Sequence, residues 1–448
     1  MAQKEGVRRR EEGVVLKEKL LKREAVVGVI GMGYVGLPLA VEKAKAGYTV
    51  IGFDIQQERV DMINKGVNYI GDVVDEDLER LVKEGKLRAT TDFSKLRECD
   101  VAAICVPTPL GKYREPDLSH VINAAKEVAK YLHREMLVVL ESTTYPGTTE
   151  EVILPMLEST GLKVGEDFYL AFSPERVDPG NKLYKTKNTP KVVGGVTPRC
   201  TELAKILYEN VLEAPVHVVS SPKVAEFAKI LENTFRLVNI SLVNELCILA
   251  KKMNVNIWEV IDAAATKPFG FMPFYPGPGA GGHCIPIDPF YLAYKAKEYD
   301  VILRMVEIAG EINVHMPEYV VSRLQDILNE RGKALKNSKV LLLGVTYKGD
   351  VNDIRESPAL KVLDILEEKG AIVLYYDPYV ESFERNWKVY RREPLTKELL
   401  ESVDAVMITA AHKRDMDYEF VVRYSPFVFD TKNVTKNVKE NREKIILL

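Results

Sequence analysis

A glycine-rich turn between two short apolar segments places the strongest constraint on how this chain folds. Residues 25–30 are apolar and rich in valine, as in a buried parallel strand, and lead directly into Gly31-Met32-Gly33-Tyr34-Val35-Gly36. Residues 37–45 have a helical pattern, and a second apolar strand at 49–53 ends at Asp54, about twenty residues beyond the glycines. Together these features predict a βαβ unit that binds a dinucleotide.

Each part of this unit has a physical role. Gly31 and Gly33 permit a tight turn and let a pyrophosphate approach the N-terminus of the following helix. Asp54 is expected to accept hydrogen bonds from the adenosine ribose hydroxyls, which favours NAD over NADP. Arg59 lies nearby in the sequence and leaves NADP open, because an arginine can accommodate a 2′-phosphate.

Further patterns predict an α/β fold with two Rossmann-like parallel-sheet lobes, joined by a long central helix and a helical middle domain. A chain of 448 residues is too long for one ordinary core. Apolar strand segments in the first lobe occur at 100–106, 137–140, 168–173 and 191–194. Those in the second lobe occur at 339–344, 371–376, 404–409 and 428–430. The second lobe lacks GxGxxG, so we expect it to bind a nucleotide but no second NAD.

Between the lobes, residues 223–253 have helical periodicity without proline or glycine, and a further helical stretch runs from about 289 to 329. The apolar face of these helices fits either a dimer or an internal core, and we expect a homodimer formed through them. The predicted domains are a charged N-terminal arm (1–24), an NAD-binding Rossmann domain (25–215), a central helical domain with a cysteine loop (216–330) and a second Rossmann-like domain (331–448).

Composition excludes several classes of function. A net charge of −3 gives no reason to expect nucleic acid or an anionic membrane as a partner. The five cysteines are odd in number and have no CxxC spacing, which argues against disulfides or a zinc site and for a reducing compartment. No apolar stretch has membrane-spanning length, and residues 1–24 lack the apolar core of a signal peptide. We therefore expect a cytoplasmic protein without a metal, whose first residues form a solvated arm; Leu16, Leu20 and Leu21 could instead mark a short amphipathic helix.

Several polar residues fall where an α/β fold places its ligands. Thr108 and Thr143 follow predicted strands, so their hydroxyls either contact a ribose, phosphate or nicotinamide or merely cap turns. Residues 174–181 form a polar loop suited to a bound sugar. On the long helix, one face carries Lys229, Asn233 and Arg236. A solvated face explains the two cations, whereas helix propensity gives no reason for the asparagine.

The segment Gly277–Pro289 holds Cys284 in a glycine-rich loop, with Asp288 four positions later. Most free cysteines are small buried hydrophobes, but a thiol in a glycine loop can reach a bound substrate. In the second lobe, the loop 347–355 brings Lys348 and Arg355 to a helix N-terminus, where two cations and the helix dipole attract phosphate.

These motifs together resemble the UDP-glucose/GDP-mannose dehydrogenase family from Val27 to about Val434. The matching segments are Gly31–Gly36, Val106–Pro109, Ser142-Thr143, Phe172–Arg176, the Lys229/Asn233 pair, the Cys284 loop and Lys348–Pro358. Several ordered motifs make a chance match very improbable.

Within the family, Gly282-His283-Cys284-Ile285-Pro286 is similar to the branch that oxidises UDP-GlcNAc or UDP-ManNAc, whereas members acting on UDP-glucose usually have serine in place of His283. Residues 267–275 are most like those of members acting on UDP-GlcNAc, and the arginines that UDP-ManNAc enzymes often carry there are missing. The expected substrate is therefore UDP-GlcNAc, then UDP-ManNAc, then UDP-glucose.

The resemblance implies four-electron oxidation of the sugar C6 hydroxyl to a carboxylate, with NAD as acceptor of two hydrides. The intermediate aldehyde would be bound by Cys284 as a thiohemiacetal and then a thioester. Lys229 would act as acid/base or stabilise the oxyanion beside Asn233, and Asp288 would assist Lys229 or the hydrolytic water. Glucose-specific members carry a second glutamate shortly after the position of Glu175, near Pro179 here, so Glu175 has only a supporting role.

The roles that the resemblance implies fall on three sets of residues. Catalytic roles fall on Cys284, Lys229, Asn233, Asp288, Thr143 and Glu175. Cofactor contacts fall on Gly31, Gly33, Tyr34, Val35, Gly36, Asp54, Arg59, Thr108, Thr143 and Arg355. Contacts to the UDP-sugar fall on Arg176, Val177, Lys229, Asn233, Arg236, Gly281, Tyr347, Lys348 and Lys432.

Two other classes of function stay open. A two-electron hydroxyacid or 3-hydroxyacyl dehydrogenase of similar architecture would not need Cys284 and would yield one NADH per substrate. A non-catalytic nucleotide-sugar binder would bind UDP without turnover. The intact glycine turn, Asp54, Lys229, Asn233 and Cys284 argue against the binder.

Overall fold

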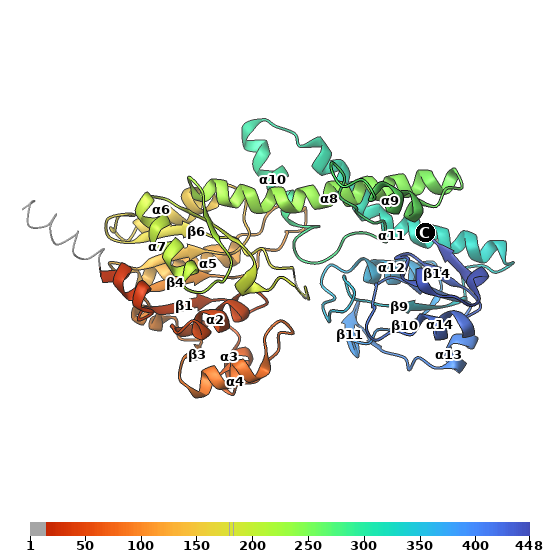
Figure 1. The fold of residues 1–448 in the computed structure, drawn as a ribbon, viewed down its shortest axis with the longest axis horizontal. Coiled ribbons are helices and arrows are strands. Elements are labelled where there is room, and N and C mark those ends of the chain that lie inside the picture. Colours follow the sequence, from red (N-terminus) through yellow and green to blue (C-terminus); the bar gives the residue numbers. More distant parts are fainter. Residues whose placement is uncertain (1–14, 179, 182) are drawn as a thin grey trace, which may run out of the picture. The chain divides into compact units, whose positions relative to one another are not determined.

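The computed structural model describes residues 15–178, 180–181 and 183–448, which separate into two compact units. The first unit contains the chain up to Glu232 together with residues 294–300, and the second contains residues 233–293 and 301–448. Each unit has its own sheet, largely or wholly parallel, with helices on both faces (Figure 1). The prediction of two Rossmann-like lobes is thus confirmed.

The sheet of the first unit has eight strands in the order β3-β2-β1-β4-β5-β6-β7-β8. Their bounds are β1 (Val26–Ile30), β2 (Thr49–Phe53), β3 (Leu87–Thr90), β4 (Val101–Ile104), β5 (Leu137–Leu140), β6 (Tyr169–Phe172), β7 (Lys191–Gly195) and β8 (Val216–Val218). All neighbours pair in parallel except β6 and β7. The strand order reverses between β1 and β4, and such a switch point is where an open α/β sheet binds its ligand.

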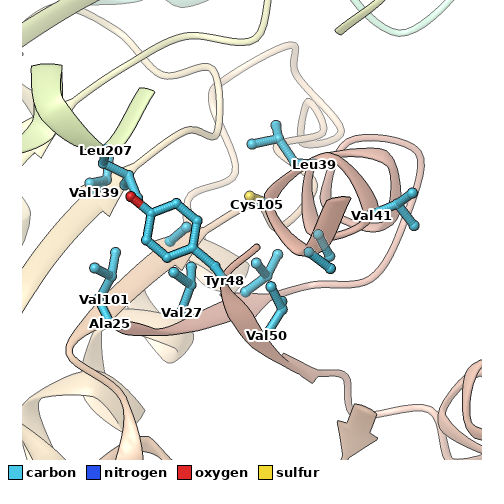
Figure 2. Close-up of a cluster of buried hydrophobic side chains, with 14 of the residues drawn as sticks. Ala25, Val27, Leu39, Val41, Tyr48, Val50, Val101, Cys105, Val139 and Leu207 are labelled. Atoms are coloured by element: carbon cyan, nitrogen blue, oxygen red, sulfur yellow. The ribbon is translucent and has the colours of Figure 1, made fainter. Parts of the chain in front are cut away.

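Helices cover both faces of this sheet because its strands are apolar on both faces. They are α2 (Gly36–Lys45), α3 (Gln57–Asn64), α4 (Asp75–Lys83), α5 (Ser119–Tyr131), α6 (Leu154–Glu158), α7 (Pro198–Glu209) and the first part of α8 (Pro222–Lys252). Val27 and Val29 pack in one core with α2, α4 and α7, whereas Ile30 packs in a second core with α5 and α6. Figure 2 shows part of the first core, where side chains from β1, α2, β2, β4, β5 and α7 meet.

The segment before β1 is packed over its second half. Residues 15–22 are helical, with Leu16 and Leu20 buried against the first core and Leu21 exposed. Lys19 pairs with Asp100 at 2.7 Å, and the Tyr48 hydroxyl donates to the Leu20 carbonyl at 2.9 Å. The expectation of a solvated arm is wrong here, because leucines four residues apart share one helix face and cover the sheet. Residues 1–14 of the predicted arm lie outside the described residues.

The second unit contains a five-stranded parallel sheet in the order β10-β9-β13-β14-β15, and its order also reverses beside the first strand of the lobe. The strands are β9 (Lys339–Leu343), β10 (Ile372–Tyr376), β13 (Ala405–Ile408), β14 (Val428–Asp430) and β15 (Ile445–Leu447), with a separate hairpin of β11 (Ser382–Arg385) and β12 (Lys388–Arg391). The four strands predicted from the sequence are present, and β15 extends the sheet.

The helices of the second unit are the remainder of α8, α9 (Ile257–Ala264), most of α10 (Asp288–Ala296), α11 (Arg304–Glu330), α12 (Pro358–Glu368), α13 (Lys397–Ser402) and α14 (Tyr418–Tyr424). The helical stretch expected at 289–329 is therefore two helices. It breaks at Asp300, whose φ of 54° is left-handed and cannot continue an α-helix. None of the described helices combines the length and the apolar character needed to cross a membrane.

Candidate functional site

The glycines between β1 and α2 occupy three different environments. Gly31 has a φ of +90°, and a Cβ there would lie 3.0 Å from the Cys105 carbonyl oxygen. A Cβ on Gly36 would lie 1.8 Å from the Gly31 oxygen, so only glycine allows α2 to begin this close to the turn. Apart from Gly33 itself and its two chain neighbours, no described residue has an atom within 4 Å of the Cβ position of Gly33. Gly33 thus offers open backbone to a ligand, as a pyrophosphate requires.

Asp54 lies at the end of β2 and is held beside this turn. Its carboxylate accepts the Met32 and Gln56 backbone N–H groups, each at 2.9 Å, and the Arg59 guanidinium lies 3.5 Å away. Tyr69, whose role no sequence pattern predicts, donates its hydroxyl to the Met32 carbonyl. Burial and the nearby Asp54 raise the pKa of Tyr69, so the phenol stays a donor. The predicted ribose acceptor is therefore fixed against the glycine turn.

Hydrogen bonds join the loops after β4 and β5, beside the switch point. The Ser142 hydroxyl donates to the Val106 carbonyl at 2.7 Å, and the Ser142 N–H donates to the Ile104 carbonyl at 3.1 Å. Thr108, in the first of these loops, is buried, and Thr143, in the second, is half-buried. Both threonines predicted to contact the cofactor thus lie in loops that share hydrogen bonds at the carboxyl ends of neighbouring strands.

The polar loop after β6 is organised by Glu175. One carboxylate oxygen of Glu175 accepts the backbone N–H groups of Arg176 and Val177 at 2.8 and 2.9 Å. The Arg176 guanidinium pairs with Glu232 of α8 at 2.6 Å and donates to the Pro190 carbonyl at 2.9 Å. Glu175 therefore holds two of the residues predicted to contact the sugar nucleotide. Pro179, where glucose-specific members differ, lies outside the described residues.

A buried ion cluster lies beneath this loop. The fully buried Glu141 carboxylate accepts hydrogen bonds from Lys43 at 3.1 Å, Lys191 at 2.9 Å and the Tyr208 hydroxyl at 2.7 Å. Burial would raise the pKa of Glu141, but the charges of Lys191 and Lys43 lower it to about 2. Lys191 also lies 3.6 Å from Glu175, which connects the cluster to the loop. The sequence signal for this cluster is an acid at the end of an otherwise apolar strand.

On α8, the residues predicted to share one face differ in exposure. Lys229 and Asn233 are buried, whereas Arg236 is exposed. The Asn233 side-chain amide donates to the Asp288 carboxylate at 2.5 Å, and the Asp288 N–H donates to the Cys284 carbonyl at 2.9 Å. Within the second unit, Asn233, Asp288 and Cys284 are therefore connected.

The Cys284 loop packs against the crossover loop of the second lobe. A Cβ on Gly281 would lie 2.6 Å from the Glu356 carbonyl oxygen, and one on Gly282, with φ +83°, would lie 2.7 Å from the Tyr347 ring. Cys284 is half-exposed, whereas the other four cysteines are buried. It is thus the most accessible thiol of the chain.

The charged groups around this loop come from three segments. The Arg355 guanidinium binds the Asp353 carboxylate, with 2.6 Å from Nη2 to Oδ2. Burial and the nearby Arg355 lower the pKa of His283, which favours a neutral imidazole. Burial also lowers the pKa of Lys432 to about 8, and its ammonium would lie 2.5 Å from a Cβ on Gly277. Lys432 thus lies against Gly277 of this loop, and Arg355 acts on the neighbouring His283.

His412 is a further residue of this region that no sequence motif predicts. Its Nδ1 accepts the Asp350 backbone N–H at 2.9 Å, so its Nε2 carries the proton and donates to Asp377 at 2.9 Å. This pair fixes the loop that contains Tyr347 and Lys348. In the described part of the chain, no three side chains of metal-ligating type gather into a site.

Known proteins match this sequence over nearly the whole chain. Residues 25–212 match the NAD binding domain of the UDP-glucose/GDP-mannose dehydrogenase family, residues 223–315 its central domain and residues 341–437 its UDP binding domain. UDP-N-acetyl-D-glucosamine 6-dehydrogenase of Pseudomonas aeruginosa is 38% identical over 391 residues, covering 87% of this chain and 91% of that protein. UDP-N-acetyl-D-mannosamine dehydrogenase of Pyrococcus horikoshii is 36% identical over 419 residues, covering 92% and 96%.

A solved structure shows the same fold. The UDP-D-ManNAc dehydrogenase of Pyrococcus horikoshii superposes with a TM-score of 0.84 at 35% identity, covering 94% of this chain and 98% of that one. The two chains therefore share one fold over nearly their whole lengths.

Proposed function

Since this chain belongs to the UDP-glucose/GDP-mannose dehydrogenase family, we propose that it oxidises the C6 hydroxyl of a UDP-N-acetylhexosamine to a carboxylate. It is an NAD-dependent UDP-sugar dehydrogenase, and its N-terminal lobe is the NAD-binding domain. The identity of the oxidised sugar is the part of this activity that we propose. UDP-GlcNAc is our first choice, because residues 267–275 are most like those of members acting on it. UDP-ManNAc is our second, because relatives of nearly equal identity are named for the two sugars. The resulting uronate would serve polysaccharide biosynthesis.

One observation carries the proposed chemistry. Cys284 is half-exposed in a loop that only glycines can form, and its carbonyl accepts the N–H of Asp288, which in turn binds Asn233. A two-electron alcohol oxidation has no use for such a thiol. A four-electron oxidation does, because a thiol can hold the aldehyde and later leave as thiolate.

The steps follow from the residues. Lys229 accepts the C6 hydroxyl proton as the first hydride leaves, and Cys284 Sγ adds to the resulting aldehyde to form a thiohemiacetal. Loss of the second hydride leaves a thioester, and water attacks its carbonyl and expels the thiolate. Bound NAD supplies the hydride acceptor in both oxidations. The overall change is one alcohol, two NAD⁺ and one water to one carboxylate, two NADH and three protons.

The Asn233 side chain can donate two hydrogen bonds in this scheme. Its amide has two N–H donors, and one of them is directed to Asp288. The second can donate to the oxyanion that develops during addition and hydrolysis. Asp288 thereby sets the orientation of the amide, whichever group deprotonates the water.

We also propose that two copies of the chain associate through α8. Phe235, Leu242, Leu246 and Leu249 recur at helical spacing on this helix and are each between 43% and 52% exposed. An apolar stripe of this kind on a water-facing helix is typical of an interface. Light scattering after size-exclusion chromatography should give twice the mass of 50.5 kDa, and a monomer would contradict the proposal.

The experiment that tests the activity counts NADH per sugar consumed, with UDP-GlcNAc, UDP-ManNAc and UDP-glucose assayed side by side. Two NADH per uronate and preference for an N-acetylated sugar are expected. One NADH per sugar would favour the two-electron alternative, and activity with UDP-glucose alone would overturn the choice of sugar.

A further inference from the structure

A fully buried carboxylate on α8 has no part in the chemistry described so far. Glu226 is 0% exposed and lies one helical turn before Lys229, so the two side chains leave the same side of the helix. One Glu226 oxygen accepts the Gly147 N–H at 2.5 Å, and the other accepts both the N–H and the hydroxyl of Thr149, at 2.8 and 2.7 Å.

These contacts tie α8 to the loop after β5. The loop begins at Ser142, whose hydroxyl donates to the Val106 carbonyl, and it ends at Gly147–Thr149, where Glu226 holds it. Thr143, the predicted cofactor contact, lies between these two points of attachment. The same carboxylate therefore joins the helix of Lys229 to the loop of Thr143.

The hydrogen bonds require the ionised form of Glu226. All three partners donate, so a proton on either oxygen would face an N–H or compete with the Thr149 hydroxyl. Burial opposes ionisation and raises the pKa of Glu226 to about 7, with nearby Glu150 acting in the same direction. Glu151 is neutralised by Lys223 at 3.0 Å and Lys295 at 2.5 Å. Glu226 forms no ion pair within the described part of the chain, and a carboxylate buried without a cation is costly.

We propose that Glu226 is a positioning residue that fixes the Thr143 loop relative to Lys229. The bound cofactor and the acid/base group of Lys229 are thereby held in a fixed position relative to each other. Thr143 can then meet the cofactor only where Lys229 can take the proton from C6. The inference rests on the proposed function, because it assigns Lys229 and Thr143 the roles given there.

Glu226→Gln is the direct test, with Glu150→Gln as the matched control for loss of a nearby negative charge. Glutamine can still accept from Thr149, but its NH2 group would face the Gly147 N–H. We expect kcat to fall at least about tenfold and the Kd of NAD to rise several-fold, because the loss of a hydrogen bond to a charged group has this size. The Kd of UDP should not change, and Glu150→Gln should behave like the wild type.

A double-mutant cycle separates positioning from general damage. If Glu226 acts through the Thr143 loop, kcat of Glu226→Gln/Thr143→Ala should be no lower than that of Thr143→Ala alone. If the two losses multiply, or if Glu226→Gln keeps wild-type kcat and NAD affinity, the inference is wrong. Should Glu226→Gln not fold, Thr149→Val removes one donor only and should produce a smaller loss in the same two quantities, and wild-type values there would overturn the proposal.

Different results would refute the proposed function and the positioning role of Glu226. A wild-type enzyme that turns over none of the three UDP-sugars refutes the proposed function. The effect of Glu226→Gln on NAD affinity remains measurable by calorimetry in that case. An unchanged NAD affinity would then refute the positioning role on its own.

Discussion

The side-chain amide of Asn233 donates to the carboxylate of Asp288 at 2.5 Å, and the two side chains are only 4% and 2% exposed. Asp288 is the first residue of α10, and its N–H donates to the Cys284 carbonyl. Asp288 thus orients the amide predicted to stabilise the oxyanion through its carboxylate, and it holds the loop of the predicted nucleophile through its backbone N–H. Asp288, which lies 55 positions after Asn233, thus connects the residues predicted for two catalytic functions.

Removing Asp288 should therefore reduce activity and stability together. Asp288→Ala leaves the Asn233 amide without its acceptor in a buried site, which costs about 1–3 kcal/mol of unfolding free energy. We expect kcat to fall by more than about a hundredfold. Urea unfolding and steady-state assays measure the two effects, and Asp417→Ala, at the N-cap of the distant helix α14, gives a stability loss of similar kind without loss of kcat. Full activity of Asp288→Ala would contradict the role given to the pair.

Replacing the thiol should interrupt the reaction between its two oxidations. Cys284→Ala retains both ligand sites but cannot hold the aldehyde, so at most one NADH per sugar is expected. Cys284→Ser should bind both ligands and stall before acid release, because an alkoxide is a poorer leaving group than a thiolate. A single-turnover experiment with mass spectrometry distinguishes the two, and Cys247→Ser, at a buried cysteine on α8, serves as control. Wild-type turnover of Cys284→Ala would end the thioester hypothesis.

Local patterns predicted the fold well because each strand, turn and helix is determined by residues that are close together in the sequence. The run from β1 through Gly31–Gly36 to Asp54 is contiguous, so spacing alone placed the turn, the helix and the acid. The second lobe was predicted in the same way from its alternating strands and helices. Where a helical pattern continued, as at 289–329, the break at Asp300 escaped detection because a left-handed residue other than glycine leaves little trace in the sequence.

The sequence could not predict contacts between segments that are far apart along the chain. Glu141, Lys43, Lys191 and Tyr208 come from four separate elements, and no spacing rule brings them together. The same holds for Glu226 and Gly147, and for His412 and Asp350. The predicted catalytic and binding residues themselves remain predictions. The structure adds the buried groups that hold several of them in place.

Alanine substitutions at Gly36 and at Gly33 of the glycine turn should have different effects. Gly36→Ala places a Cβ 1.8 Å from the Gly31 oxygen and should prevent correct packing of α2, seen as a large loss of soluble protein or of melting temperature. Gly33→Ala meets no described atom within 4 Å and should fold normally. Its Kd for NAD should rise at least about tenfold, because the methyl group occupies the approach of the pyrophosphate. Equal stability of the two variants would contradict this division of roles.

The Glu141 cluster predicts a defined dependence of stability on pH. Glu141 has its pKa lowered to about 2 in the folded protein, below its unfolded value of 4.5. An acid with a depressed folded pKa contributes stability above its unfolded pKa and loses it as pH falls through the folded pKa. The stability advantage of the wild type over Glu141→Gln should thus be full above about pH 4.5 and shrink toward pH 2. Urea unfolding at several pH values checks this, and a constant difference would contradict it.

Charge at Asp54 should decide between the two nicotinamide cofactors. Its carboxylate repels a 2′-phosphate and lies 3.5 Å from the Arg59 guanidinium. Hydrogen bonds from the Met32 and Gln56 backbone N–H groups hold the carboxylate against the glycine turn. Asp54→Asn keeps the size of the side chain and removes the charge, which weakens ribose binding and releases the guanidinium toward a phosphate. We expect the ratio of kcat/KM for NAD to that for NADP to fall at least about tenfold, since a hydrogen bond to a charged group is lost. Asp54→Asn/Arg59→Ala should lose activity with both cofactors. NAD then lacks the carboxylate that binds its ribose, and no cation at this position meets the 2′-phosphate of NADP. If the single variant keeps the wild-type ratio, the preference for NAD must come from residues other than Asp54.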